Sequence, residues 1–363
     1  MRGRTERQAA MLVAVAPEDF IPRDHPIRRI REIVDVVLAR LSPEFNGMYA
    51  RIGRPSVPPE HLIKATLLMA FYSIRSERQF CERLQYDLLF KWFLGLTINE
   101  AVFDPTSFTK NRDRLLKQDI AVLVLGEVVE EARRRKLLSE DHFSVDGTLL
   151  QAWASLKSIR PRDEQEDPPA GNSGGRNREV DFHGHRRRNA THVSRTDPEA
   201  KLARKGSAQE ARLSYSGHLL VENRNGFIVD ALLSEATGTA ERDAALRLLQ
   251  RQGIGAGATL GADKGYDTRD FVAALQEMGI SPHIARNTSN RRSAVPEDIA
   301  AEDGYALSQR RRKLAEEPFG WLKTVAQSRK LRYLGVAVNQ LWFLFGAAAY
   351  NLVRLAKLQP QSA

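Results

Sequence analysis

Between residues 143 and 285, strand-like and helix-like segments follow one another in an order that few folds accommodate. An apolar strand at 143–150 precedes a hairpin whose turn reads Asn-Arg-Asn-Gly at 223–226, a composition typical of tight β-turns. The series continues with a helix at 239–252, a strand ending near 263, a helix at 269–278 and a strand at 282–285. Antiparallel strands followed by βα units predict a mixed sheet with helices packed on its faces.

In two of these strands an apolar run ends in an aspartate, with a glycine close behind it. Asp146 is followed by Gly147 in the first strand, and Asp263 is followed by Gly265 after a later one. The element order is that of a ribonuclease-H-like fold, in which the first and fourth strands are neighbours. Both carboxylates are therefore expected at adjacent strand ends. The glycine beside Asp146 leaves room for another backbone or a ligand to approach closely.

A third acidic position lies in a basic, helix-like segment at 310–323. Glu316 stands four residues after Arg312 and seven before Lys323, which predicts one shared helix face and favours Glu316 over Glu317. Two strand-borne aspartates and a helix-borne glutamate offer the hard oxygen ligands that a pair of divalent cations needs. Each carboxylate taken alone is equally typical of a helix cap or an ion pair. Three more acidic residues are candidates for a supporting role: Asp230, Glu235 and Asp267.

The N-terminal part of the chain is predicted to be helical, with an arm and one helix at 1–39 and several short helices at 40–137. Asp104-Pro105 is a clear helix start, with aspartate at the cap and proline at the first helical position. The helix that follows carries hydroxyl, amide and cationic side chains near its beginning, as recognition helices do. Lys110 and Arg112 are therefore candidate DNA contacts, although ordinary solvated helices often have the same composition.

The charge of the chain indicates a polyanionic partner. Its formal net charge is +10, and the excess of lysine and arginine is clustered, as at Arg186, Arg187 and Arg188. Clusters of this kind favour nucleic acid over other polyanions. These three arginines lie in a segment rich in glycine, proline and charge at 158–206. Its composition predicts an irregular insertion within a catalytic domain at 138–357.

Two features bear on the cellular compartment. The single cysteine, Cys81, excludes an intramolecular disulfide and fits a reducing cytoplasm. An apolar tract at 334–355 is long enough to cross a bilayer, but Asn339, Gln340 and Asn351 interrupt it. A buried helix is the favoured interpretation, and no membrane partner is expected.

Taken together, the acidic segments resemble those of the DDE transposases of bacterial insertion sequences, most closely insertion-sequence family five. The first two motifs correspond to residues 144–148 and 261–267. The third resembles the family signature Y-x2-R-x3-E-x6-K through Arg312, Glu316 and Lys323, with Gln309 at the tyrosine position. The glutamine leaves the three acidic residues in place. It removes the tyrosine on which any step that the family assigns to that residue would depend, including formation of a hairpin intermediate.

The resemblance covers nearly the whole chain and implies an all-helical DNA-binding domain followed by a ribonuclease-H-like α/β catalytic domain. It implies a transposase that binds terminal inverted repeats, cleaves DNA at the element ends and joins the 3′ ends to target DNA. Asp146, Asp263 and Glu316 would hold two Mg²⁺ ions, for which Mn²⁺ can substitute, and Arg312 and Lys323 would contact phosphates.

The resemblance also implies a homodimer or higher assembly on DNA, because two element ends must be joined together. Two alternatives stay open. One is a metal-dependent nuclease of the same fold that cuts without joining. The other is a DNA-binding protein that has lost catalysis, which predicts the loss of one acidic residue of the triad.

Overall fold

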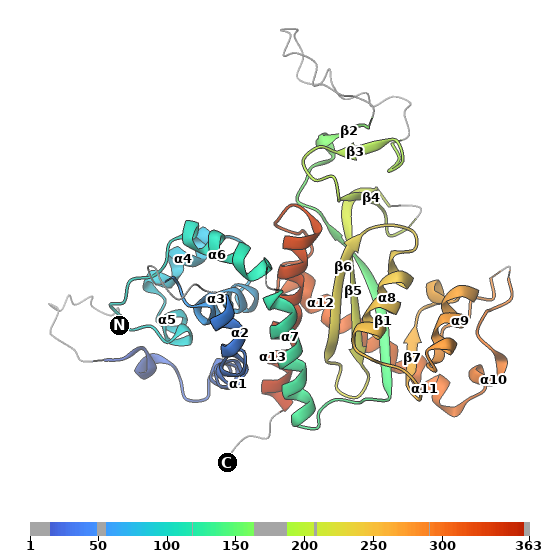
Figure 1. Cartoon of the computed structure of the whole chain (residues 1–363), viewed down its shortest axis with the longest axis horizontal. Coiled ribbons are helices and arrows are strands. Elements are labelled where there is room, and N and C mark those ends of the chain that lie inside the picture. The colour runs from blue at the N-terminus through green and yellow to red at the C-terminus, as the bar shows by residue number, and fades with distance from the viewer. Residues whose placement is uncertain are drawn as a thin grey trace, which may run out of the picture.

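The computed structural model describes residues 15–48, 56–117, 119–162, 187–206, 209–289 and 291–358. Short helices form one side of the molecule and a mixed sheet forms the other, with the long helix α13 (Val336–Leu358) between them (Figure 1). This arrangement confirms the predicted class, a helical N-terminal region followed by a mixed α/β part.

The strands of the sheet run in the order β6–β5–β1–β7–β8. β1 (His142–Gln151), β5 (Arg212–Glu222) and β6 (Ile228–Glu235) are antiparallel neighbours. β7 (Thr259–Ala262) pairs parallel to β1, and β8 (Ser281–Ile284) pairs parallel to β7. The first and fourth long strands, β1 and β7, therefore lie side by side as the ribonuclease-H-like order predicts.

The described ends of the predicted insertion at 158–206 carry regular structure that its composition does not indicate. β2 (Ile159–Pro161) and β3 (His192–Ser194) form a small antiparallel sheet. β4 (Lys201–Ala203) pairs with the first residues of β5, on the edge of that strand that β6 also uses. Strands this short depend on their partners rather than on their own pattern, so the sequence could not reveal them.

Helices cover both faces of the sheet. α8 (Ala240–Arg251) lies on the face of Gly147, where an added Cβ would come within 2.7 Å of Glu241. α13 lies on the opposite face, where a Cβ added at Gly217 would come within 3.0 Å of Phe343. The two faces differ because Gly217 pairs with Thr148, and successive residues of a strand point to opposite sides.

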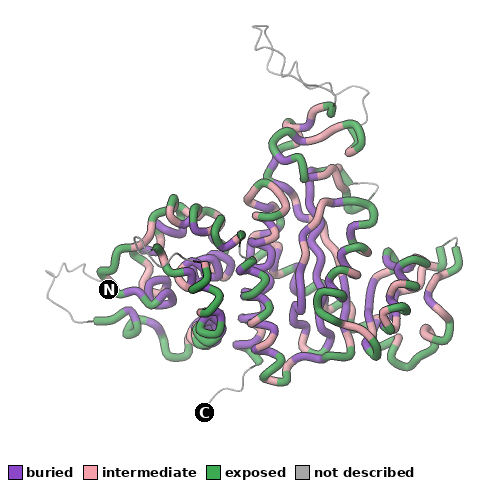
Figure 2. Tube along the Cα trace, viewed as in Figure 1, coloured by how far each residue is buried: buried purple, intermediate pink, exposed green. Residues whose placement is uncertain are grey.

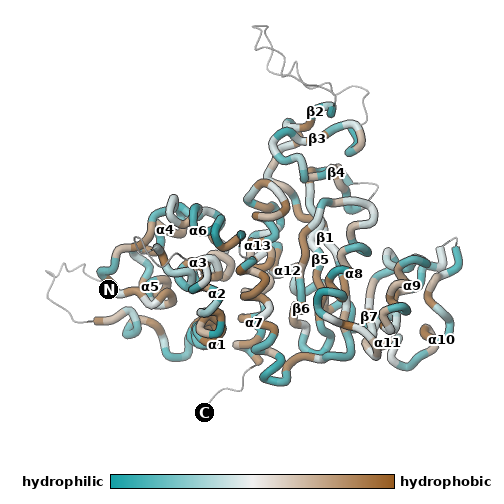
Figure 3. The backbone as a smooth tube through the Cα atoms, in the orientation of Figure 1, coloured by the Kyte–Doolittle hydropathy of each residue, from teal (hydrophilic) through white to brown (hydrophobic). Residues whose placement is uncertain are grey.

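The central helix α13 packs between β6 and three N-terminal helices, α1 (Ile27–Arg40), α3 (Pro59–Phe71) and α7 (Ile120–Arg134). Figures 2 and 3 show the result as a buried, apolar column through the middle of the molecule. By length and composition, α13 is the one helix of the described ranges that could cross a membrane, and 72% of its most apolar window is buried inside the protein. This agrees with the buried-helix interpretation.

Polar side chains that interrupt the apolar tract of α13 bond the outer edge of β6. Asn351 Oδ1 accepts from Ile228 N at 2.9 Å, and Asn351 Nδ2 donates to Ile228 O at 2.7 Å. Gln340 Nε2 donates to Ala231 O at 3.1 Å. These bonds satisfy backbone groups that a strand edge would otherwise leave unpaired in the interior.

The remaining helices are α2 (Ser42–Gly47), α4 (Glu77–Tyr86), α5 (Leu88–Leu94), α6 (Pro105–Lys117), α9 (Arg269–Glu277), α10 (Glu297–Ala300), α11 (Asp303–Arg311) and α12 (Glu316–Thr324). α6 begins as predicted, since Asp104 Oδ1 accepts from Thr106 N at 2.8 Å. Cys81 is buried in α4, and burial raises the pKa of its thiol to about 12. A thiol in this state is a packing residue rather than a nucleophile.

Candidate active site

The strand pairing brings Asp146 and Asp263 to the same level of the sheet. Ser144 of β1 pairs with Gly261 of β7, and each aspartate follows two residues later, where the two strands separate. Asp146 Oδ1 accepts from Gly147 N at 2.8 Å. Asp263 caps the turn after β7, with its Oδ1 accepting from Gly265 N at 2.7 Å. Both side chains are half-buried.

Glu316 reaches the same place from the C-terminal part of the chain. It is the first residue of α12, which follows α11 after a 3₁₀ turn at Arg312–Ala315. Pro318 lies in the first turn of α12, where its missing N–H and its ring disfavour a continuous α-helix through residue 314. Glu317 points elsewhere, because its carboxylate pairs with Arg354 at 3.0 Å.

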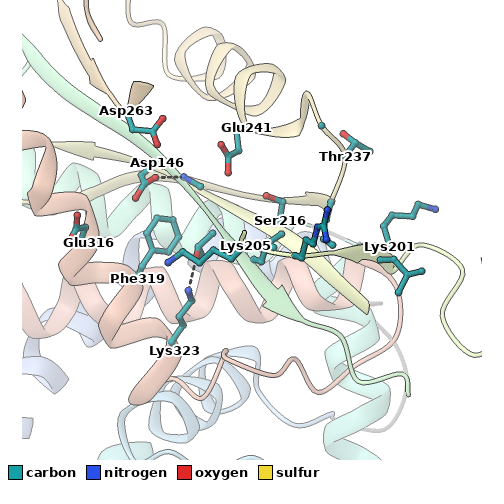
Figure 4. A pocket seen from close by; sticks show the side chains of 18 of the residues that line it. Asp146, Lys201, Lys205, Ser216, Thr237, Glu241, Asp263, Glu316, Phe319 and Lys323 are labelled. Carbon is teal, nitrogen blue, oxygen red and sulfur yellow. Dashed lines mark hydrogen bonds between the residues drawn. The ribbon is translucent and has the colours of Figure 1, made fainter. Parts of the chain in front are cut away.

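These side chains line one open pocket of about 1140 Å³. Figure 4 shows Asp146 in the middle part of β1, with Asp263, Glu316 and Glu241 of α8 around it. Lys323 forms part of the same wall, and its Nζ donates to Thr148 Oγ1. Four acidic side chains from four separate elements thus face one space.

Four carboxylates share this pocket with the cations of Lys201, Arg204, Lys205 and Lys323. None of its four carboxylates forms an ion pair within the described part of the chain. The pKa of Asp146 is raised to about 6, mainly by burial and also by the charges of Asp263, Glu241 and Glu316, while the hydrogen bond from Gly147 N acts in the opposite direction. The pKa of Glu241 is also raised, first by enclosure of its carboxylate end and then by Asp263.

The donors fit a hard divalent cation by their chemistry, since Mg²⁺ prefers carboxylate oxygens. Within the described ranges, however, no three histidine, cysteine, aspartate or glutamate side chains lie close enough together to share one ion. Like charges repel when no cation separates them. A bound cation would therefore have to draw these carboxylates together.

Comparison with known families shows which family this chain belongs to. Residues 15–114 match the family model described as Transposase domain (DUF772), and residues 180–352 match the model described as Transposase DDE domain. This chain is a DDE transposase. The second match includes Asp263 and Glu316, whereas Asp146 lies between the two matched ranges. DDE transposases act on DNA and in general use divalent metal ions.

Two solved transposases of similar structure are themselves DNA complexes. One is the piggyBac transposase synaptic complex with hairpin DNA, at 8% identity over 91% of this chain and 75% of that chain, with a TM-score of 0.40. The other is the Mos1 transposase paired-end complex with the left transposon end, at 12% identity over 77% and 82%, with a TM-score of 0.20. No curated protein sequence matches this chain significantly.

Two residues of the signature segment take positions that its spacing does not predict. Arg312 is not in the pocket lining, because the 3₁₀ turn that it begins has three residues per turn and breaks the single helix face. Gln309, at the signature tyrosine position, donates from Nε2 to His283 O at 2.6 Å and accepts at Oε1 from Arg312 Nε at 3.0 Å. In this transposase the glutamine anchors Arg312 to β8.

The residues that the sequence predicts to contact DNA differ in their exposure and in their contacts within the protein. Lys110, Arg187 and Arg188 are exposed, and Arg186 lies outside the described residues. Arg112 has an internal role, because its Nη1 pairs with Glu77 at 2.6 Å and its guanidinium lies 4.6 Å from the centre of the Tyr333 ring. Contact of any of these residues with DNA stays a prediction.

The three acidic residues expected to support the site lie elsewhere. Asp230 pairs with Arg251 at 2.5 Å, and Glu235 pairs with Lys201 at 3.3 Å. Asp267 Oδ1 accepts from Ala294 N at 2.8 Å. None of the three lines the pocket. The acidic residue that does, Glu241, carries no motif in the sequence and could be found only from its place on α8.

A basic wall lies next to the carboxylates, at the end of the basic insertion that the sequence predicts at 158–206. It is formed by Lys201, Arg204 and Lys205 at and after β4, and a neighbouring hollow continues it past Arg212 and Arg329. The sequence predicts the basic character of this segment but not its place beside the pocket, because β4 itself was not predicted. Such a wall suits a phosphate backbone that leads into the pocket.

Proposed function

We propose that this protein is the transposase of an insertion sequence of family five, which cleaves DNA at the element ends and joins the 3′ ends to target DNA. The observation that carries the proposal is the meeting of Asp146, Asp263 and Glu316 in one pocket of a DDE transposase. These residues are far apart in the sequence and lie on β1, after β7 and on α12.

In this proposal, Asp146, Asp263 and Glu316 would hold two divalent cations, Mg²⁺ or Mn²⁺. Two such cations, when bound, supply Lewis acidity at both the attacking and the leaving oxygen of an in-line displacement. Lys323 and the basic wall hold phosphates of the DNA beside the carboxylates, and Arg312 does so outside the pocket. Phosphate contacts of this kind position the backbone and carry no sequence information.

Both reactions are phosphoryl transfers that conserve bonds. In cleavage, a water oxygen forms a bond to phosphorus and the bond from phosphorus to the 3′ oxygen breaks, which leaves a 3′-OH on the element. In joining, that 3′-OH forms the new bond to a target phosphorus while one target P–O bond breaks. One bond replaces another in each step, so neither step needs an energy-supplying cofactor.

We further propose that the helices of residues 40–137 bind the terminal inverted repeats and that residues 138–357 form the catalytic domain. The arm and helix of residues 1–39 precede them. α7 packs on α13 and β6 as well as on α6, so the helical part is joined firmly to the sheet. Joining two ends requires a homodimer or a higher assembly on DNA. The expected place of action is the bacterial cytoplasm, at the nucleoid.

The test uses Asp146→Asn, Asp263→Asn and Glu316→Gln with Glu317→Gln as a matched control. Each of the first three should lower Mg²⁺-dependent cleavage of duplexes that carry the element end by about a thousandfold or more, while end binding in a mobility-shift assay stays within a few-fold. Glu317→Gln should cleave nearly like the wild type, since its exposed pair with Arg354 contributes less than about 1 kcal/mol.

Joining is tested separately with a pre-nicked end that already carries a 3′-OH. Mg²⁺ and a target plasmid should give strand-transfer products, and their absence alongside active cleavage would indicate a nuclease instead. Full cleavage in excess chelator, or a dead Glu317→Gln beside an active Glu316→Gln, would contradict the assignment of the site.

A further inference from the structure

We propose that Glu241 is a fourth carboxylate of the cation-binding site, and that residue 147 is glycine because only a residue without a side chain leaves room for it. The inference rests on the proposed function and adds a residue to the same pocket. Glu241 lies on α8, outside the three acidic motifs, and its approach to the site is a product of the tertiary fold.

The Glu241 side chain packs against the backbone of β1 directly beside Asp146. A Cβ atom added at Gly147 would lie 2.7 Å from Cγ, 2.8 Å from Oε1 and 2.9 Å from Cδ of Glu241. These distances are shorter than van der Waals contact, so any other residue at position 147 would displace the carboxylate. Gly147 is not among the glycines with positive φ. The backbone conformation therefore does not require glycine at this position, and the reason for glycine is the space that the Glu241 side chain occupies.

Helix capping does not account for the placement of Glu241. Thr239, which precedes the first turn of α8, bonds through its Oγ1 to Asp243 at 2.8 Å, whereas Glu241 has no hydrogen-bond or ion-pair partner among the described residues. The adjacent Arg242 donates from its Nη1 to Gly265 O at 3.3 Å, and its positive charge opposes the rise in the pKa of Glu241 without forming an ion pair with it. Glu241 is exposed, so the cost of its position comes from the repulsion of the neighbouring carboxylates rather than from burial.

Glu241 and Glu316 approach the site from opposite faces of β1. Glu241 comes from α8, on the face of Gly147, while α12 reaches the face of Thr148 through Lys323. Neighbouring residues of β1 point to opposite faces, so the pocket offers carboxylate oxygens from both sides of the strand. Glu241 would bind a cation held by Asp146 and Asp263 either directly or through one of its water ligands.

The experiment measures Mn²⁺ binding to the full chain by the electron paramagnetic resonance signal of free Mn²⁺, without DNA. Glu241→Gln should weaken Mn²⁺ binding at least tenfold, the range typical of lost carboxylates around a metal. Asp243→Asn is the matched control, because it removes the same charge from the same helical turn but lies outside the pocket. Asp146→Asn is the reference for loss of the site.

A second measurement, thermal unfolding in excess chelator, separates binding from structure. Without cations, Glu241→Gln should be at least as stable as the wild type, because it removes a like charge, and it should gain less stability when Mg²⁺ is added. Gly147→Ala keeps the charge but displaces the carboxylate, and it should also lose Mn²⁺ affinity. A lower stability of Glu241→Gln in chelator would show a structural role and overturn the inference.

The outcomes distinguish this inference from the function on which it rests. If Asp146→Asn loses Mn²⁺ while Glu241→Gln binds like the wild type, Glu241 is not a member of the site and the proposed function stands. If Asp146→Asn binds like the wild type, or the wild type binds no Mn²⁺, the proposed cation site fails and the inference fails with it.

Discussion

A single buried polar side chain can make the stability of the fold depend on pH, and His218 is an example. It lies on β5 with 1% of its surface exposed, and its Nε2 is 2.8 Å from Ser234 Oγ on β6. Burial lowers the pKa of His218 to about 4, so the folded protein keeps this imidazole neutral well below the pH at which an exposed histidine takes up a proton.

The consequence is a loss of stability in acid. Between pH 6.5 and 4 the unfolded chain binds a proton at His218 that the folded chain does not bind, so the free energy of unfolding falls as the pH falls. The contribution is at most about 3 kcal/mol. Urea denaturation from pH 8 to pH 4 should therefore show a shallower pH dependence for His218→Gln than for the wild type, and parallel curves would contradict the prediction.

At the scale of one helix, α6 carries two cations with different surroundings. Lys110 is exposed. Arg112 is largely enclosed, with 16% of its side chain exposed, and it pairs with Glu77, whose side chain is 13% exposed. Tyr333 OH also donates to Glu77 Oε1 at 2.9 Å. Arg112 thus connects α6 and α4 to the segment that leads into α13.

Alanine substitution should separate these two roles. Arg112→Ala leaves Glu77 enclosed without its cation and should lower the free energy of unfolding by about 3 kcal/mol. Lys110→Ala should leave stability unchanged but weaken binding to duplex DNA and reduce the salt dependence of that binding by about one phosphate contact. Equal stability of the two variants would refute the structural role of Arg112.

At the scale of the whole molecule, α13 joins the N-terminal helices to the catalytic sheet. One side of it packs on α1, α3 and α7, and the other packs on β6. Asn351 is fully buried there and makes two hydrogen bonds to Ile228. The position of the sheet relative to the N-terminal helices therefore depends on a few polar contacts inside an apolar interface.

Asn351→Leu tests this dependence. The substitution keeps the volume similar but leaves the N–H and C=O of Ile228 without partners, at about 1–3 kcal/mol for each group. The melting temperature should fall by several degrees, and cleavage activity should be lost in parallel with stability. Gln250→Leu, an exposed change on α8, should melt like the wild type. An unchanged melting temperature for Asn351→Leu would contradict the argument.

Local patterns in the sequence were enough to predict the order of the elements and the helix starts. The pairing of β1 with β7 follows from that order. Capping at Asp104 and the turn at 223–226 depend on neighbouring residues only, so they can be read directly from the chain. The candidates Asp146, Asp263 and Glu316 could also be named from short motifs, although Asp146 lies within β1 and not at its end, where the sequence predicts it.

Contacts between distant segments determined the features that the sequence did not predict. The short strand β4 exists because β5 pairs with it, and Arg112 is enclosed because Tyr333 covers it. Arg312 leaves the shared helix face because Pro318 interrupts the α-helix. Glu241 enters the pocket because α8 crosses β1 at a glycine. A sequence states which residues are available, but proximity across the fold depends on packing that no local pattern encodes.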